Sequence, residues 1–116
     1  ISERRKNAKL FVEILYNHPE LIIQKEIGRS SWFGFSIVIK PGSSITRAQL
    51  VKKLAHLGFE FRPIVTGNFL KNEVVKYFDF EISNNLKNAE HIDQNGLFLG
   101  NHHYPIKDAF KALSTL

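Results

Sequence analysis

The sequence contains no cysteine. This absence excludes disulfide bonds, thiolate nucleophiles and zinc sites built from cysteine ligands, and it is compatible with a reducing compartment. Familiar catalytic signatures are missing as well: there is no glycine-rich phosphate loop, no paired-carboxylate site and no serine–histidine–aspartate order. Any chemistry must therefore use histidines, carboxylates, hydroxyl groups or a bound cofactor.

Long apolar runs are also absent, since no stretch approaches the roughly 20 apolar residues that a membrane helix needs. Residues 2–15 are amphipathic and charged, unlike a signal peptide, so we expect a cytoplasmic protein without a membrane partner. The 116 residues give room for one domain, and an apolar fraction of 43% can supply a packed interior. The same length is short for an enzyme that binds its own cofactor.

The net charge of +5 owes much to the start of the chain, where Arg4, Arg5, Lys6 and Lys9 lie within nine residues. These cations could bind phosphate groups, although a solvated helix face is the simpler interpretation. They also oppose the partial positive charge of a helix N-terminus. Together with a first residue, Ile1, that is not methionine, they predict a domain that continues upstream in a longer protein.

Hydrophobic periodicity predicts helices and strands in the order α-β-β-α-β-α-β-α. The predicted elements are a helix over residues 2–17, strands over 21–26 and 31–40, a helix over 46–57, a strand over 59–65, a helix over 86–94, a strand over 97–100 and a last helix starting at Pro105. Residues 66–85 form a long connection with one helical turn at 73–78, and such connections are often functional. This order predicts the α+β class, with a small antiparallel or mixed sheet covered by helices.

Local patterns refine this arrangement. Residues 31–40 are apolar or small on both faces, with Phe33 and Phe35 on one face and Trp32 on the other, which predicts a strand in the middle of the sheet. Thr46 and Gln49 have the spacing of a helix-capping box. Glycine 58 ends that helix, and proline 63 places the following strand at an edge or a bend.

The segment 62–69, Arg-Pro-Ile-Val-Thr-Gly-Asn-Phe, contains the first candidate binding residues, because it carries a strand into a Gly-Asn turn. Arg62 suits a bidentate grip on phosphate or carboxylate, and Phe69 could stack on a base or sugar. A surface arginine and a core phenylalanine explain the same residues equally well.

The pair His102 and His103 suggests a metal site, but neighbours on an extended segment point to opposite sides and no third ligand lies at a recognised spacing. Histidines that cap Asn101 or touch a partner's ligand are the better hypothesis. The aromatic run at 32–35 is best interpreted as core.

Four segments, taken in order, resemble the C-terminal domain of the DegT/DnrJ/EryC1/StrS aminotransferase family. They are residues 31–35 (Ser-Trp-Phe-Gly-Phe), 62–69, 91–93 (His-Ile-Asp) and 96–103 (Gly-Leu-Phe-Leu-Gly-Asn-His-His). The second and fourth look most like the family's dehydratase branch, whose substrate is GDP-4-keto-6-deoxy-D-mannose. The resemblance implies the small domain of a fold-type-I enzyme dependent on pyridoxal phosphate (PLP) or pyridoxamine phosphate (PMP).

The resemblance further implies a homodimer that acts on a nucleotide-linked 4-keto-6-deoxy sugar in deoxysugar and lipopolysaccharide synthesis. Its PLP or PMP cofactor would be held by a large domain, because the sequence offers no phosphate pocket, pyridine-binding carboxylate and base together. Residues 1–116 would then be a single C-terminal small domain without catalytic, cofactor or metal-ligating residues, inactive alone. By position in the family, the candidate substrate-facing or interface residues are Arg62, Asn68, Phe69, Asn101 and His102. Arg62 would suit the diphosphate, and Phe69 the sugar or nucleoside.

A free-standing basic α+β module that binds nucleic acid is the second hypothesis. It predicts a one-sided basic face that extends beyond the first helix, and association that depends steeply on salt. Few cations other than Arg62 and Lys71 adjoin the candidate loop, and the aromatics alternate as core residues. The sequence therefore favours the enzyme domain.

Overall fold

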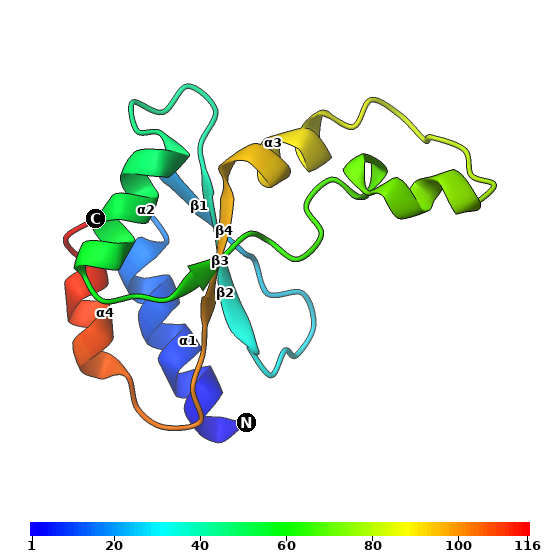
Figure 1. Cartoon of the computed structure of the whole chain (residues 1–116). Helices are drawn as coiled ribbons and strands as arrows, with labels where there is room; N and C mark the ends of the chain where they lie inside the picture. Colours follow the sequence, from blue (N-terminus) through cyan, green and yellow to red (C-terminus); the bar gives the residue numbers. More distant parts are fainter.

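A four-stranded sheet lies at the centre of the computed structural model, which describes residues 1–116 (Figure 1). The helices and strands are α1 (Ser2–Leu15), β1 (Leu21–Ile23), β2 (Gly34–Ile39), α2 (Arg47–His56), β3 (Phe61–Arg62), α3 (Lys87–Asn95), β4 (Gly96–Gly100) and α4 (Lys107–Leu113). Two 3-10 helices, η1 (Phe69–Lys71) and η2 (Glu73–Tyr77), lie between β3 and α3. No helix is long and apolar enough to cross a membrane.

The strand order is β1-β2-β4-β3, and every neighbouring pair is antiparallel. Strand β2 is therefore central and β3 lies at an edge, as the apolar faces of residues 31–40 and the proline at 63 predict. Helices α1, α2 and α4 cover one face of the sheet, whereas α3 lies on the other side (Figure 1). The predicted α+β class and element order are confirmed.

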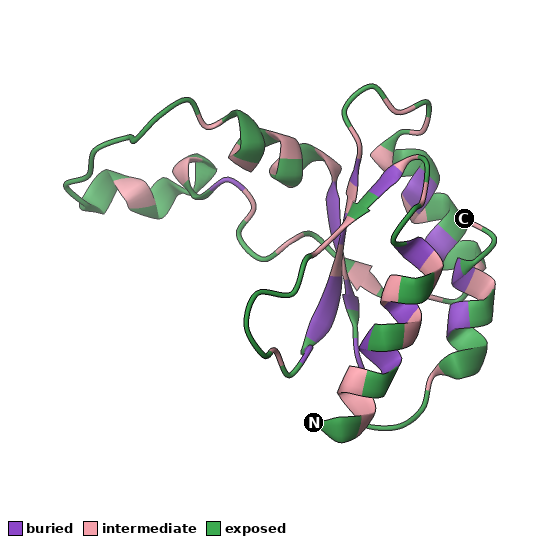
Figure 2. Cartoon of the chain, turned by 180° about the vertical axis from the view of Figure 1, so that it is seen from behind, coloured by how far each residue is buried: buried purple, intermediate pink, exposed green.

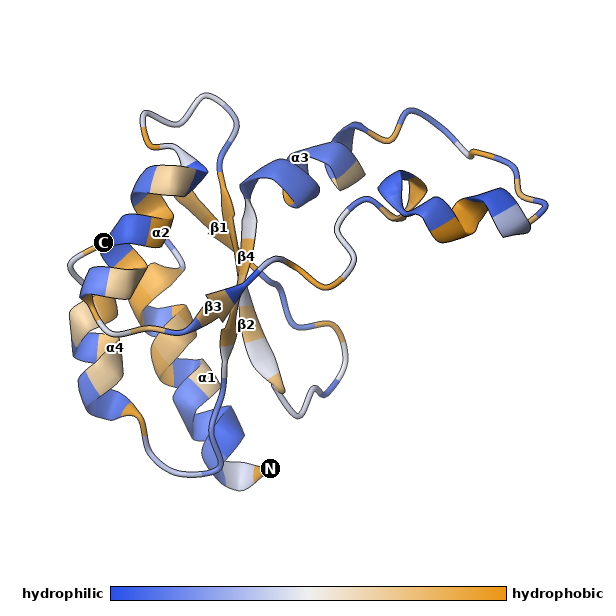
Figure 3. Cartoon of the chain, viewed as in Figure 1, coloured by the Kyte–Doolittle hydropathy of each residue, from blue (hydrophilic) through white to orange (hydrophobic).

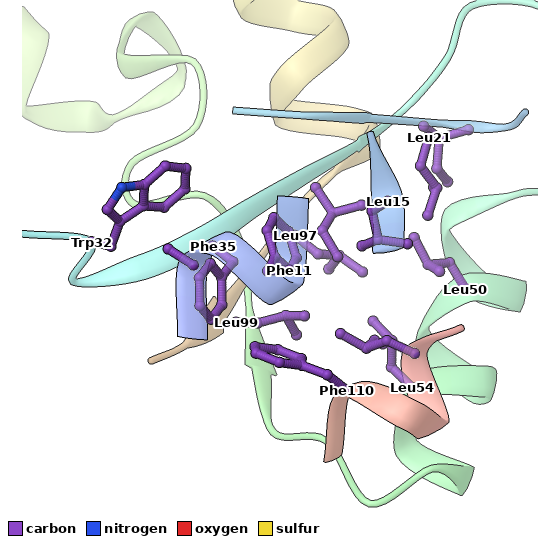
Figure 4. Close-up of a cluster of buried hydrophobic side chains, with 14 residues drawn as sticks. Phe11, Leu15, Leu21, Trp32, Phe35, Leu50, Leu54, Leu97, Leu99 and Phe110 are labelled. Atoms are coloured by element: carbon purple, nitrogen blue, oxygen red, sulfur yellow. The ribbon is translucent and has the colours of Figure 1, made fainter. Parts of the chain in front are cut away.

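Most buried residues belong to the sheet and to α1, α2 and α4 (Figure 2). At their centre the ring of Phe35 stacks on Phe11, with centroids 4.3 Å apart, and meets the edge of Phe110 at 5.6 Å. Leu50 and Leu54 from α2 and Leu97 and Leu99 from β4 complete this cluster (Figure 4). One contiguous apolar core thus joins all the helices of this layer to the sheet.

Both edge strands of the sheet are shorter than the strands predicted from the sequence. Strand β1 ends at Ile23, and the next residue, Gln24, pairs with β2 mainly through its side chain. Its Nε2 donates to the Gly34 carbonyl at 3.2 Å, its Oε1 accepts from the Ser36 N–H at 2.7 Å, and its backbone N–H donates to the Ser36 carbonyl at 3.3 Å. Strand β3 keeps only two residues, because Pro63 has no N–H to continue the pairing.

The run from Trp32 to Phe35 departs from the predicted alternation. Trp32 has a φ of +53°, a left-handed conformation that is costly for a bulky residue, and this turns its indole into the core with Phe35. Phe33 is consequently excluded from the core face and is 72% exposed. The prediction that Phe33 and Phe35 share a face is therefore wrong, because the strand begins only at Gly34.

Helix α2 begins with the predicted capping box. The Gln49 N–H donates to the Thr46 hydroxyl at 3.3 Å, and the Gln49 side chain accepts from the Thr46 N–H at 2.7 Å. Gly58 follows the helix with a φ of +79°, as expected of a left-handed C-terminal glycine.

We expect Thr46→Ala to lower the free energy of unfolding by about 1 kcal/mol, since one N–H of the first turn loses its acceptor. Urea unfolding of the variant and the parent measures the difference. Thr115→Ala, at an exposed hydroxyl near the chain end, is the matched control and should change stability less. Equal effects of the two substitutions would contradict a capping role.

The segment 64–86, which we call the arm, extends away from the sheet between β3 and α3 (Figures 1 and 3). It carries η1 and η2 and contributes no residue to the main core. Its exposed large apolar side chains are Val65, Phe69, Val74, Tyr77, Phe78, Phe80 and Ile82. Such a concentration of exposed apolar groups is typical of a surface that contacts other protein.

Candidate functional site

A groove of about 620 Å³ lies beside the edge strand β3, between the α2–β3 connection and the segment that joins β4 to α4. Its lining includes Phe33, Glu60, Arg62, Phe98 and His102. Most of the surface is apolar, with one guanidinium and one carboxylate. A concave apolar surface with few polar groups is the usual form of a small-molecule site.

Phe98 forms an aromatic surface in this groove because Gly34 has no side chain. A Cβ at Gly34 would lie only 2.2 Å from the Phe98 ring, so glycine is needed for the ring to lie over β2. Phe33 stacks beside it with centroids 6.2 Å apart, and the Arg4 guanidinium lies 5.6 Å from the Phe33 centroid. Arg62 is the cross-strand partner of Phe98. The two rings thus adjoin two arginines, one over Phe33 and one on the strand beside Phe98.

The opposite side of the groove is formed after β4. The imidazole of His102 stacks on the Tyr104 ring with a centroid distance of 4.7 Å, and both residues line the groove. Aromatic groups therefore border the groove on both sides.

A buried pair of asparagines holds the segment after β4 against α1. The Asn101 amide donates to the carbonyls of Arg4 at 2.9 Å and Trp32 at 2.8 Å, and its oxygen accepts from Asn7 Nδ2 at 3.1 Å. Asn7 also donates to the carbonyls of His102 and Tyr104. Both donor positions of Asn101 are used inside the domain, so its main effect on the groove is to fix the surrounding backbone.

Asn68 and Phe69 lie at the root of the arm and do not line the groove. Asn68 is buried, and its side chain caps η1 by accepting from the Leu70 N–H at 3.2 Å. Phe69 is 47% exposed. The arm is fastened to α3 by an ion pair of 2.6 Å between Lys71 Nζ and the Asp93 carboxylate. Gly67 passes so close to Asp93 that a Cβ would collide with it.

The contacts at the arm root shift the pKa of both partners. The hydrogen bond from Lys71 and then the N–H of Asn68 hold the pKa of Asp93 below its ordinary value, and the hydrogen bond to Asp93 raises the pKa of Lys71. A lowered carboxyl pKa gives stability that is present above the unfolded value near 3.8 and is lost as pH falls through the lowered folded value. The lysine's contribution is lost only at strongly alkaline pH.

We therefore expect Asp93→Asn to destabilise the protein at pH 7, and we expect the difference from the parent to shrink as the pH is lowered below about 4. Thermal unfolding across this pH range measures it. Asp79→Asn, on the arm and without an ion pair, is the control. A difference that persists unchanged at acidic pH would exclude the carboxylate as its cause.

The structure brings together Arg62, Asn101 and His102 of the five predicted site residues, and it places Asn68 and Phe69 elsewhere. Sequence reasoning missed Glu60, Phe98 and Tyr104 in the groove, together with Asn7. The exposed Phe33 also belongs to this site and not to the core. Only the alternation of Glu60 with Arg62 before Pro63 was a usable signal, since both side chains then share a face.

Three of the four cations of α1 have a polar partner within the domain, and the fourth, Arg4, contacts an aromatic ring. Arg4 lies over Phe33, Arg5 Nε donates to the Ser30 carbonyl at 2.9 Å, Lys6 pairs with Glu3 at 2.6 Å and Lys9 with Glu13 at 4.0 Å.

No group of three or more histidine, aspartate and glutamate side chains is placed to hold a metal ion. The lining of the groove contains no lysine that could form a Schiff base with PLP.

The model of the DegT/DnrJ/EryC1/StrS aminotransferase family matches residues 1–111. The chain belongs to this family. It is 54% identical over 114 residues to the GDP-4-keto-6-deoxy-D-mannose 3-dehydratase of Yersinia pseudotuberculosis and 56% identical over 109 residues to that of Escherichia coli O55:H7. These matches cover 97% and 93% of this chain but only 29% and 28% of the relatives.

Solved structures of this family have the same fold. The Escherichia coli dehydratase with bound hydrated PLP superposes with a TM-score of 0.93 at 53% identity, covering 98% of this chain and 30% of that one. A variant of such a dehydratase with bound GDP-perosamine matches with the same score, identity and coverage. The chain thus corresponds to less than a third of these family members.

Proposed function

We propose that this chain is the C-terminal small domain of a PLP- or PMP-dependent nucleotide-sugar enzyme, specifically a 3-dehydratase for a GDP-linked 4-keto-6-deoxy sugar. The observation that carries the proposal is identity of 53–56% over nearly the whole chain to 3-dehydratases, with a TM-score of 0.93. An aminotransferase of the same family is the second candidate, favoured by the family match itself.

The proposed domain organisation is a single small domain, residues 1–116, beside a large domain that holds the cofactor. The coverage of the relatives supports it, because about 70% of each solved relative lies outside the matched part. The arm supports it too, since its exposed apolar side chains would be covered by further protein. The cofactor supplies the electron sink for loss of the C3 hydroxyl, and this chain contributes substrate contacts and closure of the site.

Substrate contacts are proposed for Arg62 and His102, which face one groove. A guanidinium binds diphosphate oxygens in bidentate fashion, which suits Arg62. Asn101 would support these contacts indirectly, because its hydrogen bonds hold the backbone around the groove. Asn68 and Phe69 would act at the root of the arm, toward the sugar or toward the adjoining domain.

The test uses the full-length protein loaded with PMP and supplied with GDP-4-keto-6-deoxymannose. We expect loss of the C3 hydroxyl, detected by mass spectrometry of the released sugar, and we expect the isolated chain to be inactive. A 4-amino sugar as the main product would favour the aminotransferase. Turnover by residues 1–116 alone would contradict the proposed division of labour.

A further inference from the structure

We propose that residues 78–82 of the arm, Phe-Asp-Phe-Glu-Ile, form a β-strand by pairing with an open sheet edge of the cofactor-binding large domain of the same protein. This inference rests on the proposed function and adds to it the segment and the hydrogen bonding by which the two domains join. Apolar and acidic residues alternate throughout the segment. Such alternation is typical of a strand with one face on protein and the other in water.

The segment is exposed along its whole length. It follows η2 directly, and its first residue, Phe78, has the φ of −119° and ψ of 140° of a strand. The next residues belong to no helix or strand, and Figure 1 shows them as an open connection before α3. The side chains of Phe78, Phe80 and Ile82 are 57%, 51% and 59% exposed. Three large apolar groups within five residues point to cover by other protein.

The backbone of this segment has no partner within the chain. None of the N–H and C=O groups of residues 79–84 makes a hydrogen bond to another part of the chain. Water can satisfy these groups while they are exposed, but protein that covers Phe80 would displace that water. Apolar docking alone would leave the covered groups without hydrogen bonds. Addition to a sheet edge pairs them and places every second side chain on the partner.

The direction of the arm is set by contacts within this domain. His91 Nε2 lies 2.7 Å from the carbonyl oxygen of Ile39, which fastens α3 to the end of β2. The ion pair of 2.6 Å between Lys71 and Asp93 fastens η1 to α3. A segment that is presented in a fixed direction loses less conformational entropy when it pairs with another sheet.

The large domain is the partner that the fold and the comparisons favour. The arm leaves the sheet on the side opposite to α1, α2 and α4, and it adds no residue to their core (Figure 1). About 70% of each solved relative lies outside the part that matches this chain, which is enough for a further sheet. The sheet edges of this chain, β1 and β3, are three and two residues long. They are too short to pair with all five residues, which argues against a second copy of this domain as the partner.

The experiment follows hydrogen exchange of individual backbone amides in the full-length protein loaded with PMP. We expect alternate amides of residues 78–82 to exchange at least about tenfold more slowly than in an unstructured peptide of the same sequence, because an edge strand pairs through every second residue. Phe80→Asp should return them to within about twofold of the peptide rate. Phe80 is exposed in this domain, so the substitution leaves the domain folded. Glu81→Gln, on the acidic face, is the matched control and should keep the slow exchange.

Exchange of all five amides at the peptide rate, in an enzyme that still removes the C3 hydroxyl, would overturn this inference and leave the proposed function intact. Slow exchange that survives Phe80→Asp would also overturn it, because the apolar face would then not hold the segment. A halved molecular mass of Phe80→Asp in light scattering would assign the segment to a second copy and overturn the large domain as its partner. Failure of the parent to bind PMP or to dehydrate any GDP-linked sugar would instead remove the proposed function.

Discussion

Phe35→Ala should lower the free energy of unfolding by about 3–5 kcal/mol. The phenyl ring is fully buried between the sheet and the helices, stacked on Phe11 at 4.3 Å and in contact with the rings of Phe110 and Trp32. Removing it leaves a cavity among three aromatic groups. These rings come from α1, α4 and the segment before β2, so they cannot collapse into the space together.

Urea unfolding followed by near-ultraviolet circular dichroism measures the loss. Phe78→Ala is the matched control, because this phenylalanine lies on the arm and is 57% exposed. It should change the stability of the isolated chain by less than about 0.5 kcal/mol. If both substitutions cost the same, Phe35 would not be the centre of a close-packed core.

The elements that the sequence predicted well are those whose signals are local. The capping box of Thr46 and Gln49 depends on two residues three positions apart, and it appears as expected. The edge position of β3 follows from the missing N–H of Pro63 alone. The apolar faces of residues 31–40 correctly indicated a central strand, since both sides of β2 are occupied by neighbours.

The failures occurred where a backbone angle or a distant partner decides the outcome. No sequence pattern indicates the positive φ of Trp32, which moves the indole into the core and leaves Phe33 in the groove. The ladder contacts of Gln24 depend on β2, whose partner atoms lie 10 and 12 residues away. Periodicity describes one element at a time, so it does not reveal such exchanges between elements.

The same difference between local signals and contacts of distant elements explains which residues of the candidate site the sequence revealed. Arg62, on a predicted strand, and His102, just after one, were candidates because they lie in the segments that resemble the family, and the groove contains both. Asn7 did not stand out, because its partner Asn101 lies 94 positions away. Phe98 could be assigned to the site only from the structure, in which the strand order places it beside Arg62 and the ring of Phe33.

Asn101→Ala should lower the free energy of unfolding by about 2–4 kcal/mol, because it leaves buried polar groups without partners. The carbonyl of Trp32 would lose a 2.8 Å hydrogen bond in the interior, and Asn7 would lose its 3.1 Å acceptor. Asn72→Ala, an exposed asparagine that caps η2, is the matched control and should cost about 1 kcal/mol or less.

A double-mutant cycle distinguishes this network from simple loss of packing. Asn7 and Asn101 share one hydrogen bond and secure the same segment after β4, so Asn7→Ala with Asn101→Ala should cost less than the sum of the single substitutions. We expect a coupling energy of about 1 kcal/mol or more, since contacting residues in one network couple by 0.5–3 kcal/mol. Additive effects would mean that each amide acts alone. The backbone around the groove would then lack a support that Asn7 and Asn101 share.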